Sequence, residues 1–572
     1  MTAPVAERGS ARQRGGGIGR AAVLIGAITM LGRVIGFGRQ VVFAHTVQAS
    51  CLGTAYTTAN MVPNIIYDIV MGGALAAVVV PVLAGPARAA AGPAPGDGAP
   101  GDGAPGDGAA GDGAEAAGRE QVRQTSAALV SWAVLLLVPV SVVIAVLARP
   151  LVSLLLGGTP GCPRASMVAL GARMLVVFAP QILLYGLAVV LYGILQAHRR
   201  FAAPALAPVL SSLVVIGAYF WFGVAGSGYQ DLARPVPVLA WIVLAAGTTA
   251  GVAALVATPL LPAARLHLRL RPRLRFPAGI GARVRALAAA GVATLIAQDA
   301  SVAVVIVLAN SLGGSGALVL YSFAWAVFFV PYAVLAVPIA TSAFPELSAR
   351  SGSFDATSAT STRAVTVASW LGVAGMAGTC IPLARVFQSH VGQAADARQL
   401  TIALAAFAPG LVGYGLTANL SRVLYAEGSK GRSRAAALAV SGGWLLVIVA
   451  DLLIVPFVPR SAVVPWLGAG TTIGLTGSGV ALLVLVRRCR GPQALRGWAR
   501  AALAGLAGAL AGAAAGLGLS VGVRVSGFLP NVAVTLLASA AVLVAFLAVV
   551  AVADGGDLRA VLRSAGPRRG RA

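Results

Sequence analysis

Two arginines lie six residues apart inside a long apolar stretch near the start of the chain. Arg33 and Arg39 belong to the run GRVIGFGRQ, residues 32–40, and on a helix their spacing is about 9 Å of rise. A charge at the centre of a bilayer costs at least ~2.5–3.5 kcal/mol, so such a side chain faces a cavity or a partner. Two cavity guanidinium groups would bind phosphate through paired hydrogen bonds. The structural alternative is an ion pair, for instance of Arg39 with Asp68.

Few other ionisable residues lie inside apolar stretches. Asp299 and Asp451 are far from the ends of theirs, where a carboxylate serves as a packed hydrogen-bond partner or in ion coupling. Arg422 and Glu427 lie near one edge, where long side chains reach back to the headgroups. We keep all four as candidates for ion coupling or for a structural polar role.

Prolines recur in or at the ends of the apolar stretches, where they break backbone hydrogen bonds. They are either packing kinks or hinges, and their recurrence in both halves of the chain favours hinges. The candidate hinge residues are Pro63, Pro81, Pro180, Pro331, Pro345 and Pro409.

The composition indicates that a membrane surrounds these residues. Of 572 residues, 58% are hydrophobic and only 10% are charged, whereas a soluble domain carries roughly 25% charged residues. Stretches of about 20 apolar residues, each enough for one span, recur from end to end. We expect about fourteen spans: 19–47, 56–84, 125–148, 166–195, 203–224, 236–260, 284–310, 316–343, 364–388, 400–426, 435–457, 462–486, 499–522 and 529–553.

The basic residues predict which way the spans point. With the N-terminus inside, the inner connections hold 31 of the 42 Lys and Arg residues and the outer connections hold six. Basic residues concentrate in cytoplasmic connections, so both termini are expected in the cytoplasm. The net charge of +25 therefore indicates lipid contacts and no nucleic-acid partner.

A duplication organises the chain. Phe178-Ala179-Pro180 recurs as Phe407-Ala408-Pro409, with matching residues downstream of each. This predicts an all-α membrane protein of two six-helix lobes related by a parallel repeat, as in transporters, plus two further helices. The expected parts are a cytoplasmic tail 1–18, a first lobe 19–260, a basic cytoplasmic connection 261–283, a second lobe 284–486, two helices 499–553 and a basic tail 554–572.

Segment 85–124 inside the first lobe repeats Gly-Asp-Gly with a period of five residues. Gly, Pro, Ala and Asp in this proportion predict a flexible cytoplasmic linker, with calcium binding as the alternative. Cys51 and Cys162 both fall in expected outer connections, so a disulfide is open beside two isolated thiols. No catalytic or nucleotide-binding motif appears, so we expect no enzyme, no cofactor and no metal, with transport driven by an ion gradient or the membrane potential.

Several sequence blocks, in order, resemble the MurJ/MviN family of lipid II flippases, within the superfamily that includes the MATE exporters. They run through the first ten spans: 32–39, 63–64 with 72–74 and 80–84, 180–181 with 195–198 and 201–204, 341–348 and 421–426. The resemblance implies a V-shaped, two-lobed transporter with a cationic central cavity and a groove at the last two helices for a polyprenyl tail.

The family's first-span arginines correspond to Arg33 and Arg39, and with Asn64 and the membrane carboxylate Asp68 they form the expected substrate cavity. The chain departs from the family elsewhere: Tyr67 and Asp68 replace an arginine pair common in the family. Two positions at which the family has acidic residues are Gln40 and, at or near residue 54, Thr54. An arginine of the family is replaced by Ala326 or a neighbouring residue. This cavity is therefore less cationic than the family's better-known form.

The resemblance implies a bacterial cytoplasmic-membrane flippase that moves the undecaprenyl-linked peptidoglycan precursor to the outer leaflet for cell-wall synthesis. Its partners would be that polyprenyl-diphosphate-linked glycan, membrane lipids, a coupling ion and cell-wall synthesis proteins. Two alternatives stay open: an ion-coupled exporter of another lipid-linked glycan or of small drugs, and a scaffold without transport.

Overall fold

The computed structural model describes residues 7–69, 107–198, 200–266, 271–276, 280–349, 352–388, 394–523 and 525–565. These residues contain helices and connections and no strand. Within these residues, eleven helices are long and apolar enough to cross a membrane, and the number is 13 if each of two bent helix pairs is one span. Of the fourteenth expected span, 56–84, the first part lies in α2 (Cys51–Asp68), and residues 70–84 lie outside the described residues. The expected all-α membrane fold is therefore confirmed.

The first lobe contains the helices before the basic connection. They are α1 (Glu7–Thr46), α2 (Cys51–Asp68), α4 (Asp107–Val146), α5 (Ala148–Leu156), α6 (Arg164–Phe178), α7 (Pro180–Ala197), α8 (Ala202–Ala225) and α9 (Val238–Ala264). α8 packs along both α1 and α9, α7 lies between α4 and α9, and α2 packs on α6. A Cβ at Gly247 or Gly251 of α9 would collide with α8, so these glycines set the close approach of the two helices.

The second lobe repeats this plan with more breaks. It contains α10 (Ile280–Leu308), η2 (Ala309–Gly313), α11 (Ala317–Pro331), η3 (Tyr332–Ala336), α12 (Val337–Ser348), α13 (Phe354–Gly378), α14 (Cys380–Val386), α15 (Ala394–Phe407), α16 (Gly410–Ala426), α17 (Lys430–Ile454), η5 (Val455–Phe457), η6 (Arg460–Ala462) and α18 (Val463–Arg490). After η7 (Pro492–Leu495), α19 (Trp498–Gly522) and α20 (Phe528–Ala565) pack on each other and on α13.

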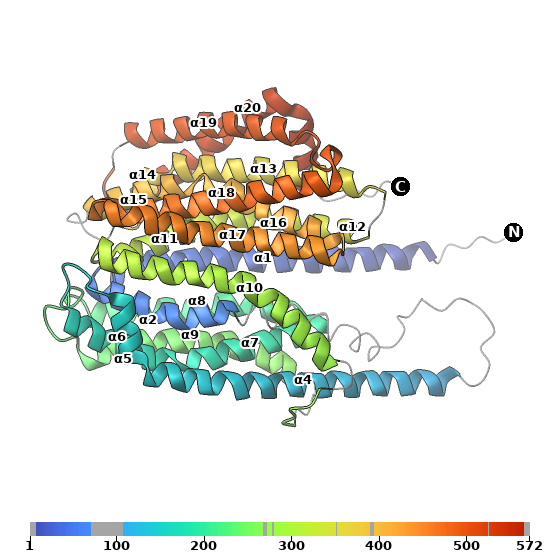
Figure 1. Ribbon diagram of the computed structural model, residues 1–572, viewed down its shortest axis with the longest axis horizontal. Coiled ribbons are helices and arrows are strands. Elements are labelled where there is room, and N and C mark those ends of the chain that lie inside the picture. The colour runs from blue at the N-terminus through green and yellow to red at the C-terminus, as the bar shows by residue number, and fades with distance from the viewer. Residues whose placement is uncertain are drawn as a thin grey trace.

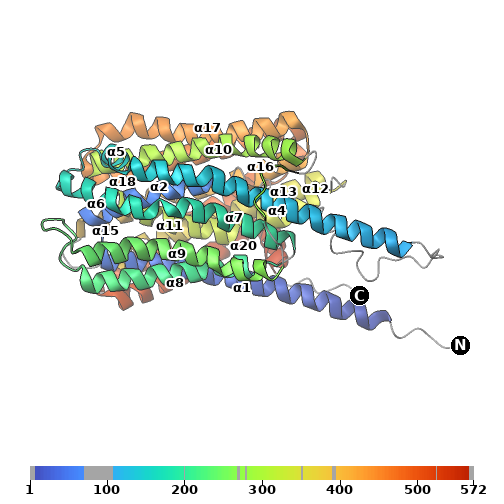
Figure 2. The same cartoon turned by 90° about the horizontal axis from the view of Figure 1, so that it is seen from below.

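The helices run side by side along one direction, so the bundle has two ends (Figure 1 and Figure 2). We call the end at which α1 begins, α20 ends and the arginine-rich connections lie the basic end. The opposite end, with residues 47–50, 157–163, 309–316 and 455–462, is the gate end. Large apolar side chains such as Val146, Val224 and Leu529 are 74%, 87% and 74% exposed. An apolar surface of this kind suits lipid as the surrounding medium.

The expected linker 85–124 is partly wrong, because residues 107–124 belong to α4. Alanine-rich sequence around residue 116 favours a helix, and Glu120 pairs with Arg123 three residues later at 2.6 Å. Residues 85–106 lie outside the described part of the chain. At the termini, α1 and α20 likewise continue past their expected spans into segments 1–18 and 554–572.

Candidate functional site

Arg33 lies on the face of α1 that is directed toward the second lobe. Its side chain is exposed, and its guanidinium carbon lies 5.0 Å from the centre of the Phe329 ring on α11. A cation over an aromatic face is a weak and easily replaced partner. Arg33 is therefore positioned between the lobes while it remains accessible to an anion.

Arg39 lies nearer the first lobe's interior. It interacts electrostatically with Tyr56, Tyr185 and Tyr219, and Tyr185 donates a hydrogen bond to Asn64 Oδ1 at 3.0 Å. The structure thus brings Arg39 and Asn64 to one group of tyrosines. Among the described residues, no ion pair within 4 Å joins Arg39 to Asp68.

Asp68 ends α2 and is partly buried. The neighbouring Tyr67 ring lies 4.3 Å from the Tyr185 ring. Asp68 also interacts electrostatically with Asp299 and Tyr414 of the second lobe. Through its neighbour Tyr67, Asp68 therefore lies beside the Tyr185 side chain that also contacts Asn64.

Asp299 and Asp451 are buried carboxylates, 4% and 1% exposed, whose oxygens have no hydrogen-bond partner among the described residues. Asp451 packs against Gly470 of α18, where a Cβ would collide with its Oδ1. The buried Thr471 is next to that glycine. Because burying a bare carboxylate is costly, each of these positions is suited to a proton or a cation.

Arg422 and Glu427 lie at different places in the second lobe. Arg422 lines a polar cavity of about 210 Å³ with Gln298, Ser421 and Ser478, and its Nη1 donates to the carbonyl of Ala418 on its own helix. Glu427 follows α16, and its side chain is 4% exposed. Its carboxylate pairs with Arg432 at 2.9 Å and with Arg490 at 3.3 Å. Glu427 therefore joins the ends of α16, α17 and α18.

Three of the six candidate hinge prolines lie at a helix break or beside an irregular turn. Pro180 and Pro409 lie at the α6–α7 and α15–α16 breaks, and the second pair is bent by 42°. Pro331 precedes the π-helical turn η3. Pro63 and Pro345 lie inside α2 and α12, whereas Pro81 lies outside the described residues.

The lobes are joined at the gate end by buried polar contacts. Asn310, which is 0% exposed, donates from Nδ2 to Thr58 Oγ1 at 2.9 Å and to the carbonyl of Leu155 at 3.0 Å. The Gly316 amide donates to Thr54 Oγ1 at 2.9 Å, and His45 Nε2 bonds the Val386 carbonyl at 2.9 Å. These contacts hold the gate end closed. The sequence does not predict these contacts, because a single Asn, Thr or His has no recognisable spacing or motif.

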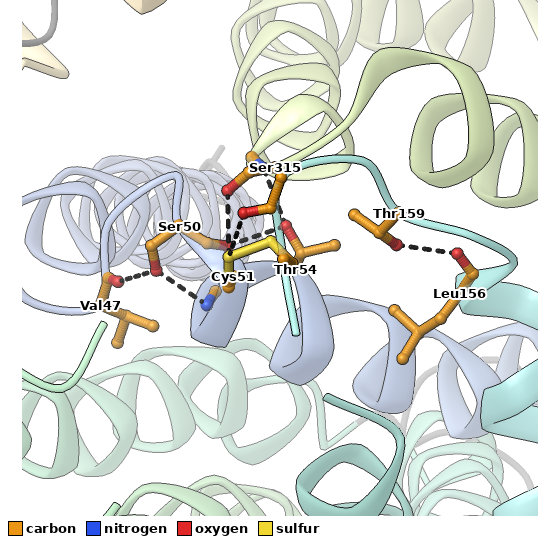
Figure 3. Close-up of a disulfide and its surroundings, with 11 residues drawn as sticks. Val47, Ser50, Cys51, Thr54, Leu156, Thr159 and Ser315 are labelled. Carbon is orange, nitrogen blue, oxygen red and sulfur yellow. Dashed lines mark hydrogen bonds between the residues drawn. A yellow bond between two sulfur atoms is a disulfide. The ribbon is translucent and has the colours of Figure 1, made fainter. Parts of the chain in front are cut away.

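A disulfide strengthens the first lobe's side of this closure (Figure 3). Cys51 at the start of α2 is bonded to Cys162 in the α5–α6 connection, with a Cα–Cα distance of 5.7 Å. The same connection contacts the second lobe, because a Cβ at Gly157 would collide with Ser311. Ser315 of the second lobe lies beside Cys51 (Figure 3). The disulfide that the sequence left open is therefore present and fixes a loop of the gate end.

The fold is similar to that of solved transporters of the MOP superfamily. It is similar to a MATE-family multidrug transporter in its inward-facing conformation, with 14% identity, a TM-score of 0.55, and coverage of 82% of this chain and 98% of that one. A MOP-superfamily transporter from Pyrococcus furiosus with a binding pocket of reversed polarity has 14% identity, a TM-score of 0.53, and coverage of 82% and 94%. At these identities the likeness shows the fold alone.

A further structure shares the fold, and a family model identifies the family. The structure of the lipid II flippase MurJ in an inward closed conformation matches with 16% identity and a TM-score of 0.65, and the match covers 92% of this chain and 99% of that one. The family model of the lipid II flippase MurJ matches residues 43–520. Because that match spans most of the chain, the protein belongs to the MurJ family of lipid II flippases, and the resemblance seen in the sequence is confirmed.

Proposed function

We propose that this protein moves the undecaprenyl-linked peptidoglycan precursor, lipid II, from the inner to the outer leaflet of the cytoplasmic membrane. The observation that carries the proposal is the position of Arg33, exposed between two lobes that are closed at the gate end. Family membership supplies the class of substrate, and alternating access supplies the mechanism.

The diphosphate of the substrate fits the cations of α1. A guanidinium group donates two parallel hydrogen bonds to a phosphate. Arg33 exchanges its weak contact with Phe329 for such a pair, and Arg39 adds a second positive charge deeper in the first lobe. Asn64 and Tyr185 provide neutral polar groups for the headgroup beside Arg39.

The direction of transport rests on the charge distribution. The basic end carries the arginine-rich connections, which favour the cytoplasmic side. With the gate end outward and closed, the substrate enters from the cytoplasmic leaflet, the lobes rock about the proline-marked breaks, and the gate opens to the outer leaflet. Asp451 and Asp299 are the candidate groups for coupling this cycle to an ion.

One observation favours a second candidate, an ion-coupled exporter of small cationic compounds. Asp68 is partly buried at the end of α2, and Asp299 is buried without a hydrogen-bond partner among the described residues. Tyr67 and Asp68 stand where many family members have arginines. A cationic drug would use this carboxylate pair and would not need Arg33. Arg33→Ala therefore separates the candidates, since it would abolish transport by a phosphate-binding flippase but leave drug export through the carboxylates active.

The proposal is tested by depleting the protein in its cell of origin and measuring the leaflet in which lipid II accumulates. Precursor trapped in the inner leaflet should be released by the wild type and not by Arg33→Ala or Arg39→Ala. Arg173→Ala, which removes an exposed arginine of α6, is the matched control and should restore transport. Normal exposure of lipid II on depletion would contradict the proposal.

A further inference from the structure

A polar cavity inside the second lobe contains a cation that the proposed transport does not use. The cavity has a volume of about 210 Å³ and lies between α10, the turn η3 and the helices α16, α17 and α18. Arg422 is the one charged residue among the described residues that line it. Tyr425, another lining residue, is 41% exposed near the end of α16. The cavity therefore reaches the surface on the side of the basic end.

Arg422 is available to an anion. Its side chain is partly buried, and among the described residues its guanidinium makes one hydrogen bond, from Nη1 to the Ala418 carbonyl of its own helix. None of the ion pairs within 4 Å in the described part of the chain includes Arg422. Because a guanidinium group has five N–H donors, most of the donors of Arg422 remain for a ligand.

The rest of the cavity lining is neutral. Tyr414 and Trp444 provide aromatic walls, and the Ser478 hydroxyl, which accepts from Thr417 at 3.1 Å, keeps its own proton for a ligand. The volume is below the ~300–1,000 Å³ of sites that enclose a drug-sized ligand. The cavity therefore suits one terminal group of a larger ligand, and a carboxylate matches the fork of a single guanidinium.

Aromatic rings connect this cavity to the cation between the lobes. The Phe329 ring centre lies 5.0 Å from the Arg33 guanidinium carbon and 5.5 Å from the Tyr332 ring centre. Tyr332 lines the cavity and stacks on Tyr414 at 3.9 Å. A single phenylalanine ring thus separates Arg33 from a wall of the cavity. Tyr332 also begins the π-helical turn η3, and such turns are frequent at functional sites.

We propose that this cavity binds a carboxylate of the substrate's headgroup peptide while Arg33 holds the diphosphate. The inference rests on the proposed function, because a lipid-linked peptidoglycan precursor carries both groups. The diphosphate replaces the contact of Arg33 with Phe329, and the headgroup extends past that ring to Arg422. Arg422 then recognises the headgroup, whereas Arg33 recognises any polyprenyl diphosphate. The candidate ion-coupling residue Asp451 does not line the cavity, so the two sites are separate.

The test measures the affinity of the purified full-length protein for three probes by native mass spectrometry. The probes are lipid II with free peptide carboxylates, the same lipid II with those carboxylates amidated, and undecaprenyl diphosphate, which has no headgroup. The variants are Arg422→Gln and Arg33→Ala. The matched control is Arg434→Gln, which removes an exposed arginine of α17 that does not line the cavity.

Wild type and control should bind amidated lipid II at least about tenfold more weakly than lipid II, because the charge-assisted fork of Arg422 is lost. Arg422→Gln should bind both forms equally, at the weaker level, and should bind undecaprenyl diphosphate as the wild type does. The comparison of the two lipids on the wild type does not depend on the folding of a variant. Equal affinity there would overturn the proposal, and so would a preference that persists in Arg422→Gln.

Two further measurements identify which inference has failed. If millimolar acetate, but not chloride, reduces lipid II binding to the amidated level, the cavity takes free small carboxylates and the headgroup is overturned as their source. Arg33→Ala should weaken the binding of lipid II and of undecaprenyl diphosphate alike. Undiminished binding of undecaprenyl diphosphate to Arg33→Ala would contradict the proposed function, while a preference for free carboxylates that requires Arg422 would still support the headgroup site.

Discussion

Asn310→Ala should shift the protein away from the conformation in which the gate end is closed. Asn310 is fully buried and donates hydrogen bonds to Thr58 and Leu155 of the other lobe. Each bond contributes about 1 kcal/mol net, so losing both should destabilise the closed form by about 2 kcal/mol. Because ~1.4 kcal/mol is tenfold in an equilibrium constant, the ratio of closed to open protein should fall about 30-fold.

The shift can be measured as a distance across the gate end by double electron–electron resonance. Spin labels on Ser227→Cys and Ser461→Cys place one probe on an exposed connection of each lobe. The free thiols Cys380 and Cys489 are first changed to Ser, which leaves the disulfide intact. Wild type should give one short distance, and Asn310→Ala should add a longer one.

Asn419→Ala is the control for this measurement. Asn419 is also fully buried and donates to Thr362 Oγ1 at 3.0 Å, but both residues belong to the second lobe. It should lower thermal stability without adding a new distance. If Asn310→Ala leaves the distance distribution unchanged, or if both variants shift it equally, the lobes are not held by this contact and the reasoning fails.

Three other predictions follow from single contacts. Replacing Cys51 and Cys162 by Ser should destabilise the protein by about 2–4 kcal/mol, the usual effect of a lost disulfide. Thermal unfolding with and without reductant checks this. The reductant should lower the unfolding midpoint of the wild type and leave that of the variant unchanged. Glu427→Gln should cost about 1–3 kcal/mol, because its buried carboxylate pairs with two partly exposed arginines; an unchanged unfolding midpoint would show the cluster to be dispensable. Asp451→Asn should remove any stabilisation by the coupling cation, measured as the rise of the unfolding temperature with sodium or with falling pH; an unchanged response would exclude Asp451 as the ion site.

The spans were predictable because each had to be apolar over its whole length. A single chemical requirement, set by the bilayer thickness, gave the positions of the 13 spans that the described residues contain. The boundary at α4 was not predictable in the same way. Helix propensity at residues 107–124 outweighs the glycines there, and hydropathy does not report propensity.

The candidate site was predictable only in part, for a similar reason. Arg33 and Asp451 are conspicuous in the sequence because a charge inside an apolar stretch is rare. Glu427 was judged by its position near a span end, but its partners Arg432 and Arg490 come from other helices. The gate contact of Asn310 depends on which segments of the two lobes pack against each other, and sequence periodicity does not predict which segments these are.

The most direct test of the central claim is flipping of a labelled lipid II by the purified protein in liposomes. The account predicts that wild-type protein exposes inner-leaflet lipid II to an external reagent, and that Arg33→Ala abolishes this exposure while Arg173→Ala does not. Wild-type flipping that survives Arg33→Ala unchanged would contradict the role of the cation between the lobes.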